Sequence, residues 1–274
     1  MRSTFLTLIL AALVAAPWSP AAAETFTFAG QSVVLDAPAG YCRLDPANTT
    51  DAQYIEAMKK VQEGRNHIVF MFAGCDGLTA ARAGKVDQLS DSGAVMIVMN
   101  GSRIVAVPGM TRARFVDEAS RQVAAADTAG LRDELRKRTK EAGLGVDLGG
   151  MKVLGVLKKD ELGVYIGFLL PSGAGANAQS IMTINAITLV NSLPVSVVIG
   201  RPVVKEGVAD DLLAIEQSTV KRLIDANAAI EAAAPEPESF WGGVLRSALI
   251  GGVVAGLGGA VFQFIQRRRK RGDV

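Results

Sequence analysis

The feature that most constrains this chain is its carboxy-terminal end, where a glycine-rich apolar stretch runs directly into a block of positive charges. Between residues 244 and 265 the clearly polar side chains are Arg246, Ser247 and Gln263, all near the ends of the stretch. A helix that crosses a bilayer needs about 20 predominantly apolar residues. The sequence therefore predicts one transmembrane helix over residues 244–265.

The basic block predicts how that helix is oriented. It consists of Arg267, Arg268, Arg269, Lys270 and Arg271. Positive residues beside a membrane span favour the cytoplasmic side and contact anionic lipid headgroups. We therefore expect residues 266–274 to form a short cytoplasmic tail, with the bulk of the chain on the outer side of a bacterial inner membrane, facing the periplasm.

Two alternatives remain for the apolar stretch. It could be an amphipathic helix on the membrane surface, although it has no polar face. It could also be a core helix of a globular domain, although the abrupt basic block argues against that assignment.

Small residues recur along the predicted span at helical spacing. They form two neighbouring rows, one with Gly252 and Gly256 and the other with Gly251 and Gly259. Such rows let two helix backbones approach closely, so they predict a helix–helix interface with a second copy or with another membrane protein. The alternative is that glycine is simply common in membrane spans and in this chain.

The amino-terminal end has the pattern of a secretory signal. Arg2 precedes an apolar run of about a dozen residues, and Ala21-Ala22-Ala23 supplies small residues at a cleavage site. We predict a signal peptide over residues 1–23; an uncleaved anchor is the alternative. An outer domain would then cover residues 24–231, followed by a proline-containing linker over residues 232–243.

Charge and composition exclude several functions for the outer domain. Residues 24–239 hold 22 Lys and Arg residues against 26 Asp and Glu residues, a net charge of −4 that argues against nucleic-acid binding. The chain has a single histidine, which excludes a histidine-rich metal site. We therefore expect neither cofactor nor metal, and membrane lipid as one partner.

The two cysteines, Cys42 and Cys75, predict a disulfide bond. Paired cysteines are typical of exported chains, and this pair would close a loop of about 33 residues. Separate buried thiols and a redox pair are the alternatives, but CxxC spacing is missing.

Hydrophobic periodicity predicts an α+β domain with a mainly antiparallel sheet and flanking helices. The expected order is ββ-α-β-ββ-α-ββ-ββ-α, with Asn100-Gly101 as a hairpin turn and a helix over residues 111–140 divided near Gly130. Glycine-rich residues 143–150 are an alternative boundary between two domains. In element order alone, the outer region resembles PsbP/Mog1-like domains, which implies an exported or binding module.

Motifs for catalysis are weak. Gly173, Gly175 and Ala178 match the looser dinucleotide fingerprint, but a strand rather than a helix is expected after them. Adjacent carboxylates Asp210 and Asp211 suit a helix start. The sequence therefore favours a membrane-tethered binding or interaction module in envelope assembly, sensing or a membrane complex. The alternative is an envelope hydrolase whose site is not visible in sequence.

Overall fold

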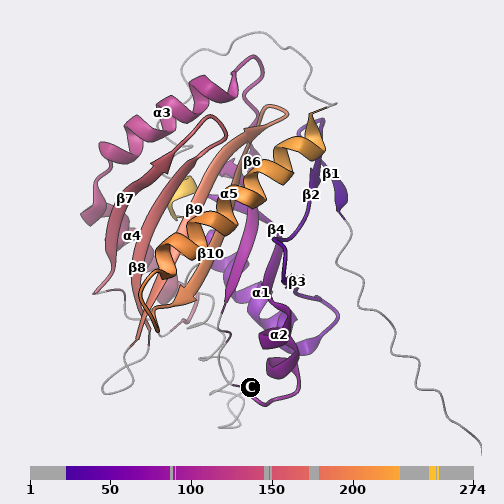
Figure 1. The fold of residues 1–274 in the computed structure, drawn as a ribbon, viewed down its shortest axis with the longest axis vertical. Coiled ribbons are helices and arrows are strands. Elements are labelled where there is room, and N and C mark those ends of the chain that lie inside the picture. The colour runs from indigo at the N-terminus through magenta and orange to yellow at the C-terminus, as the bar shows by residue number, and fades with distance from the viewer. Residues whose placement is uncertain are drawn as a thin grey trace, which may run out of the picture.

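An eight-stranded antiparallel sheet is the centre of the computed structural model, which describes residues 23–86, 89, 91–144, 148, 150–172, 179–228, 247–250 and 252 (Figure 1). The strands follow the order β3-β4-β5-β10-β9-β8-β7, and β6 pairs with β5. These strands are β3 (Tyr41–Arg43), β4 (Asn66–Gly74), β5 (Ser92–Asn100), β6 (Arg103–Ile104), β7 (Lys152–Lys159), β8 (Val164–Ser172), β9 (Gln179–Val190) and β10 (Leu193–Pro202). A separate hairpin consists of β1 (Glu24–Phe28) and β2 (Gln31–Leu35).

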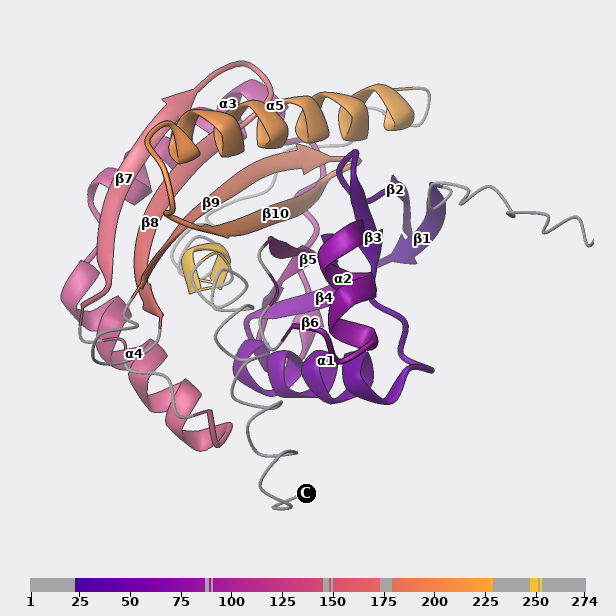
Figure 2. The ribbon, with the colours of Figure 1, turned by 60° about the horizontal axis from the view of Figure 1, so that its bottom comes forward.

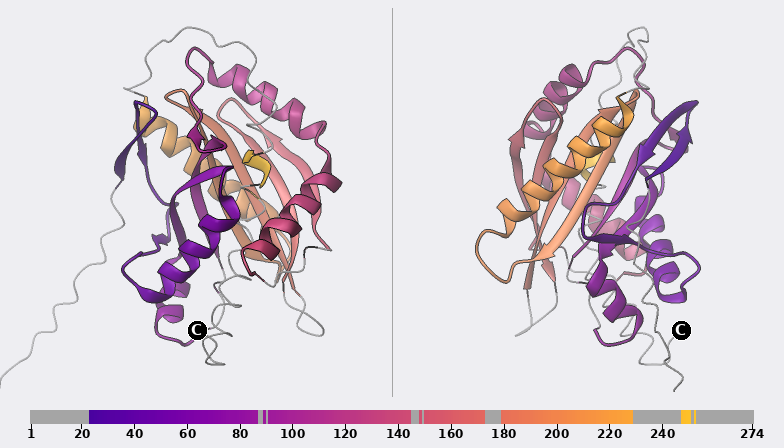
Figure 3. Two further views of the ribbon diagram at one scale, coloured as in Figure 1. Left: turned by 180° about the vertical axis from the view of Figure 1, so that it is seen from behind. Right: turned by 45° about the vertical axis from the view of Figure 1, so that its right-hand side comes forward.

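Helices cover both faces of the sheet (Figure 3). They are α1 (Thr49–Gln62), α2 (Cys75–Arg82), α3 (Arg112–Ala124), α4 (Thr128–Glu141) and α5 (Val208–Asn227). One face of the sheet shares a buried apolar cluster with α1 to α4, and the opposite face shares a second cluster with α5 and the β1–β2 hairpin. Because both faces are covered, β9 and β10 are buried along almost their whole length, and their sequences are mostly apolar.

Local capping explains where the predicted helix over residues 111–140 divides. The chain leaves helical geometry between α3 and α4, and the Asp127 carboxylate then accepts hydrogen bonds from the main-chain N–H groups of Ala129 and Gly130. The division thus lies before an aspartate N-cap, and the predicted division near Gly130 is wrong by a few residues.

Close packing in the sheet centre requires glycine at Gly93 on β5. A Cβ atom there would lie 1.9 Å from the carbonyl oxygen of Val198 on β10 and 2.6 Å from the ring of Phe72 on β4. Neither strand has room for even one added methyl group, so the three central strands can approach only if this position is glycine.

The predicted fold class is confirmed as an α+β arrangement with a mostly antiparallel sheet and flanking helices. Within the described ranges, none of the helices combines the length and the apolarity that a membrane crossing requires. Three predicted segments lie outside the described residues. They are the signal peptide up to residue 22, the linker 232–243, and the basic tail 266–274 with Arg267, Arg268, Arg269, Lys270 and Arg271. Of the predicted span, residues 247–250 and 252 are described.

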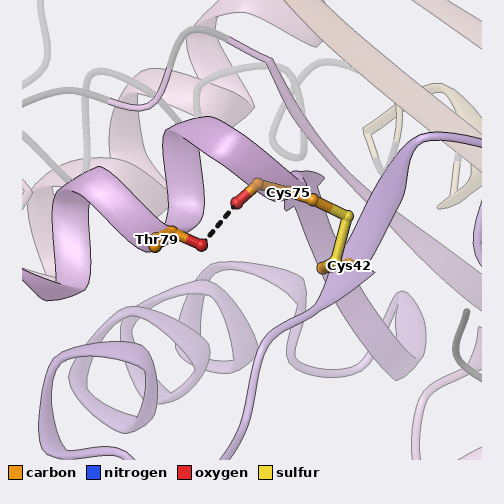
Figure 4. The surroundings of a disulfide bond; sticks show 3 residues. All are labelled: Cys42, Cys75 and Thr79. Carbon is orange, nitrogen blue, oxygen red and sulfur yellow. Dashed lines mark hydrogen bonds between the residues drawn. A yellow bond between two sulfur atoms is a disulfide. The ribbon is translucent and has the colours of Figure 1, made fainter. Parts of the chain in front are cut away.

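The predicted disulfide between Cys42 and Cys75 is confirmed (Figure 4). Cys42 lies in the short edge strand β3, and Cys75 is the first residue of α2. The main-chain carbonyl of Cys75 accepts a 2.9 Å hydrogen bond from the Thr79 hydroxyl. Since β3 has only three residues and pairs with β4 alone, the covalent bond fixes the sheet edge to the helix that follows β4.

We expect the double substitution Cys42→Ser with Cys75→Ser to lower the free energy of unfolding by about 3–4 kcal/mol, because closing a loop of this length restricts the unfolded chain. Urea denaturation of the full chain measures the change. Reduction of the unsubstituted chain serves as a control and should give the same shift, whereas an unchanged midpoint would contradict a stabilising role for the bond.

Candidate binding cleft

The candidate site lies on the sheet face that carries α1 to α4, where a helical turn of the same chain is buried; we call the space that this turn fills the cleft. In Figure 2 the sheet curves around this turn, of which residues 247–250 and 252 are described, and the turn lies between β9 and α1. Ser247, Ala248, Leu249 and Ile250 are 1%, 0%, 5% and 0% exposed, so the turn is enclosed on all sides. It therefore occupies the position that the core-helix alternative describes, far along the chain from the elements around it.

Two buried side-chain amides hold this turn by its main chain. Asn66, the first residue of β4, donates from Nδ2 to the carbonyl oxygen of Ser247 at 2.7 Å. Asn185, in the middle of β9, donates from Nδ2 to the carbonyl oxygen of Ala248 at 2.9 Å. The two donors come from different strands and contact consecutive peptide groups, so they fix both the position and the direction of the bound turn.

Each amide is oriented by a further hydrogen bond. Asn66 Nδ2 also donates to Gln62 Oε1 at the end of α1, over 2.9 Å. Asn185 Oδ1 accepts from the Ser196 hydroxyl on β10, over 2.6 Å. With its oxygen engaged in this way, Asn185 presents its N–H group toward the cleft. The contact with Ser196 thus places a hydrogen-bond donor on the cleft floor.

The polar cleft floor is costly unless it is occupied. Thr183, Asn185 and Ser196 are each 0% exposed, on a sheet face that is otherwise apolar. A buried donor without an acceptor costs about 1–3 kcal/mol. Among the described residues, Asn185 Nδ2 is satisfied by the Ala248 carbonyl, which identifies a peptide backbone as the chemistry that this floor accommodates.

Apolar contact and close approach add to the main-chain hydrogen bonds. Full burial of Leu249 and Ile250 stabilises the bound turn by about 1.5–3 kcal/mol for each side chain. At Gly252 a Cβ atom would lie 2.5 Å from Nδ2 and 2.7 Å from Cβ of Asn185. The cleft therefore fits a helical turn with large apolar side chains on some sides and a glycine against β9.

The structure places the predicted site residues in different environments. It joins Cys42 to Cys75, and it sets Gly252 against Asn185 of the domain. Gly251, Gly256 and Gly259 lie outside the described residues, so a helix–helix interface through this row stays a prediction. Among the described residues, no group of three or more His, Cys, Asp or Glu side chains is positioned to hold a metal ion.

Sequence reasoning missed both amide anchors. Asn185 and Thr183 interrupt the apolar run of β9 at alternate positions, which is the spacing of one face of a strand. That spacing is a usable signal of a polar patch inside the core. Asn66 gave no such signal, because it stands beside a turn where asparagine is common.

A second polar cluster lies at the ends of strands and joins β3, β10 and the residue before β5. Arg201 on β10 donates from Nε to Asp91 Oδ2 at 3.0 Å and from Nη2 to the Tyr41 hydroxyl oxygen at 3.3 Å. Burial, reinforced by the Asp91 charge, raises the pKa of Tyr41 to about 12. The phenol therefore keeps its proton at neutral pH, and the cluster ties β3 to β10.

α5 carries a buried carboxyl group, that of Glu216, on the opposite face of the sheet. Glu216 is 0% exposed, and neither of its carboxyl oxygens has a hydrogen-bond partner among the described residues. Burial raises the pKa of Glu216 well above its ordinary value of 4.5, and the neighbouring main-chain amide of Ile199 opposes this only in part. Burial therefore favours the protonated, neutral form of this side chain.

No protein-family model matches this chain, and no curated protein matches it. Among solved structures, the chain is similar to the Ran-binding protein Mog1p of Saccharomyces cerevisiae, at 10% sequence identity and a TM-score of 0.27. The similarity covers 76% of this chain and 95% of the yeast chain. At this TM-score the likeness leaves the family unassigned, so function is inferred below from the geometry of the cleft.

We expect Ile250→Ala to lower the free energy of unfolding of the outer domain by about 2–5 kcal/mol, because it empties volume inside the core. Urea denaturation of the full chain in mild detergent, followed by circular dichroism, measures this. Val204→Ala, at a side chain that is 74% exposed, is the matched control and should change little. Equal midpoints for the two variants would contradict burial of the turn.

We expect Glu216→Gln to remove a pH dependence of stability. The folded state binds the Glu216 proton more tightly than the unfolded state, so this contribution is complete below pH 4.5 and is lost as the pH rises through the folded-state pKa. Between about pH 5 and pH 8, the unsubstituted chain should therefore lose stability relative to Glu216→Gln. Urea midpoints across this range measure the effect, with the exposed Glu206→Gln as control. If the urea midpoints of Glu216→Gln and Glu206→Gln changed with pH in the same way, this would contradict the assigned role of Glu216.

Proposed function

We propose that this chain is a membrane-tethered, periplasm-facing binding module, and that its cleft binds an apolar helical segment. The observation that carries the proposal is the pair of buried amides, Asn66 and Asn185, on consecutive main-chain carbonyls of a small, apolar helical turn. This is a helix-in-groove mode of recognition, with main-chain hydrogen bonds added to apolar contact.

The proposed location has separate support. The Cys42–Cys75 bond suits an oxidising compartment such as the periplasm. The apolar stretch 244–265 and the basic residues after it suit a tether in the bacterial inner membrane with the carboxy terminus in the cytoplasm. A tether of this kind would hold the cleft near the outer leaflet, where apolar helices of other membrane proteins are available.

Binding ranks above hydrolysis because of the chemistry of the ionisable groups. The Tyr41, Asp91 and Arg201 cluster is a set of mutually bonded ionisable groups such as a hydrolase site would require. Its phenol keeps its proton up to about pH 12, whereas a general base acts best with a pKa near the working pH. The cluster thus suits a structural role better than nucleophilic or base catalysis.

The cleft has a neighbouring hollow in which a probe can be placed. Met99 and Asn66 both line a cavity of about 380 Å³ between the end of α1 and the β4–β5 edge. A photoreactive phenylalanine derivative in place of Met99 would therefore report on segments that enter beside Asn66. Val204, which is exposed, offers a control position.

We expect the Met99 probe in native membranes to form an adduct with an apolar helical segment of a second membrane protein, identified by mass spectrometry of the crosslinked peptide. Asn185→Asp should reduce this adduct at least tenfold, because a carboxylate offers no donor to the bound carbonyl. Asn100→Asp, at an exposed turn, should leave it unchanged. Adducts confined to polar loops, or insensitive to Asn185→Asp, would contradict the proposal.

A further inference from the structure

The residues that fill the cleft also belong to the stretch predicted to cross the membrane. Residues 247–252 lie near the start of the apolar run 244–265. In the structure residues 247–250 are enclosed by the domain, and Ser247 and Ala248 are hydrogen-bonded to Asn66 and Asn185. A single turn of helix cannot lie in lipid and in the cleft at the same time, so the two locations compete for it.

The length of the apolar stretch prevents the chain from filling the cleft and spanning the membrane at the same time. The full stretch of 22 residues rises about 33 Å as a helix, which matches a hydrocarbon core of about 30 Å. With residues 247–252 in the cleft, 13 residues of the stretch remain, 253–265, and as a helix these rise about 20 Å. Tilting only shortens their reach across the bilayer. A chain with a filled cleft therefore cannot complete the span.

From this competition we infer that residues 247–252 are a built-in plug of the cleft, and that insertion of the stretch 244–265 into lipid withdraws the plug and opens the binding site. The inference rests on the proposed function, because it takes both the tether and the cleft from it. It adds a regulatory step, since the cleft becomes available to a partner helix only on a chain that is already in the membrane.

The chemistry of the turn suits both locations. Leu249 and Ile250 are favourable in an apolar cleft and in lipid, and Gly252 allows close approach to β9 as it would to another helix. When the turn leaves, it uncovers the amides of Asn66 and Asn185 together with the apolar cleft wall. A vacant cleft therefore favours a replacement that supplies the same main-chain carbonyls and apolar surface.

A disulfide trap tests the inference directly. A Cβ atom at position 252 lies 2.7 Å from Cβ of Asn185, so a shift of about 1 Å brings Asn185→Cys and Gly252→Cys within bonding geometry. The full chain would be synthesised with and without vesicles of phosphatidylethanolamine and phosphatidylglycerol, oxidised, and scored for resistance to alkaline extraction. Peptide mapping separates the new bond from the native Cys42–Cys75 bond, and Val204→Cys with Gly252→Cys is the matched control pair.

We expect the trap to form at least tenfold more in the vesicle-free chain than in the extraction-resistant chain, and the control pair to form it in neither. If the trap formed equally in the extraction-resistant chain and the vesicle-free chain, this would overturn the withdrawal of the plug but not the plug itself. Absence of trapping in both preparations, together with fast hydrogen exchange at residues 247–250 of the unsubstituted chain, would overturn the plug. Trapping in a chain that never resists extraction would overturn the tether, and with it the regulatory step.

Gly252→Leu gives a second measurement that keeps Asn185 intact. Its side chain collides with Asn185 and should expel the turn from the cleft. In the vesicle-free chain, hydrogen exchange at the main-chain amides of residues 247–250 should then be at least tenfold faster than in the unsubstituted chain. If hydrogen exchange in Gly252→Leu were as slow as in the unsubstituted chain, this would overturn the assigned position of the plug against Asn185.

Discussion

The contact between two buried amides and a helical turn more than sixty residues away in sequence completes the core of this domain. Asn185 stands with Thr183 and Ser196 on a sheet face that is mostly apolar, and its donor is satisfied by the carbonyl of Ala248. Buried amide groups are tolerated in a core only when they are paired. The face of the sheet that bears α1 to α4 therefore depends on a segment that lies outside the regular order of strands and helices.

The two faces of the sheet are closed in different ways. α5 is a twenty-residue amphipathic helix that covers its face, and its own Glu216 is buried there with a raised pKa. The opposite face is covered by four shorter helices, and the short turn with residues 247–250 and 252 fills the space left between them and the sheet. A cover made of one turn is held by far fewer contacts than a twenty-residue helix. It is therefore the part of the core best suited to exchange with another segment.

Recognition by such a cleft would be selective for shape and backbone more than for particular side chains. Asn66 and Asn185 contact main-chain carbonyls, which every helix has, and Gly252 marks a position, among the described residues of the turn, where the approach is too close for a side chain. Small-residue helices of membrane proteins meet these requirements. A module with this specificity would suit assembly or surveillance of membrane proteins at the outer face of the bilayer.

The sequence by itself determined the fold class, the antiparallel hairpins and the Cys42–Cys75 bond, because periodicity, turn residues and a pair of cysteines are local or nearly local signals. It also identified residues 244–265 as apolar, but hydropathy is the same for a core helix and for a membrane helix. Only the tertiary structure decided that residues 247–250 and 252 lie against β9 and that Asn66 and Asn185 meet there, because those contacts join segments far apart in sequence and depend on how the sheet curves around them.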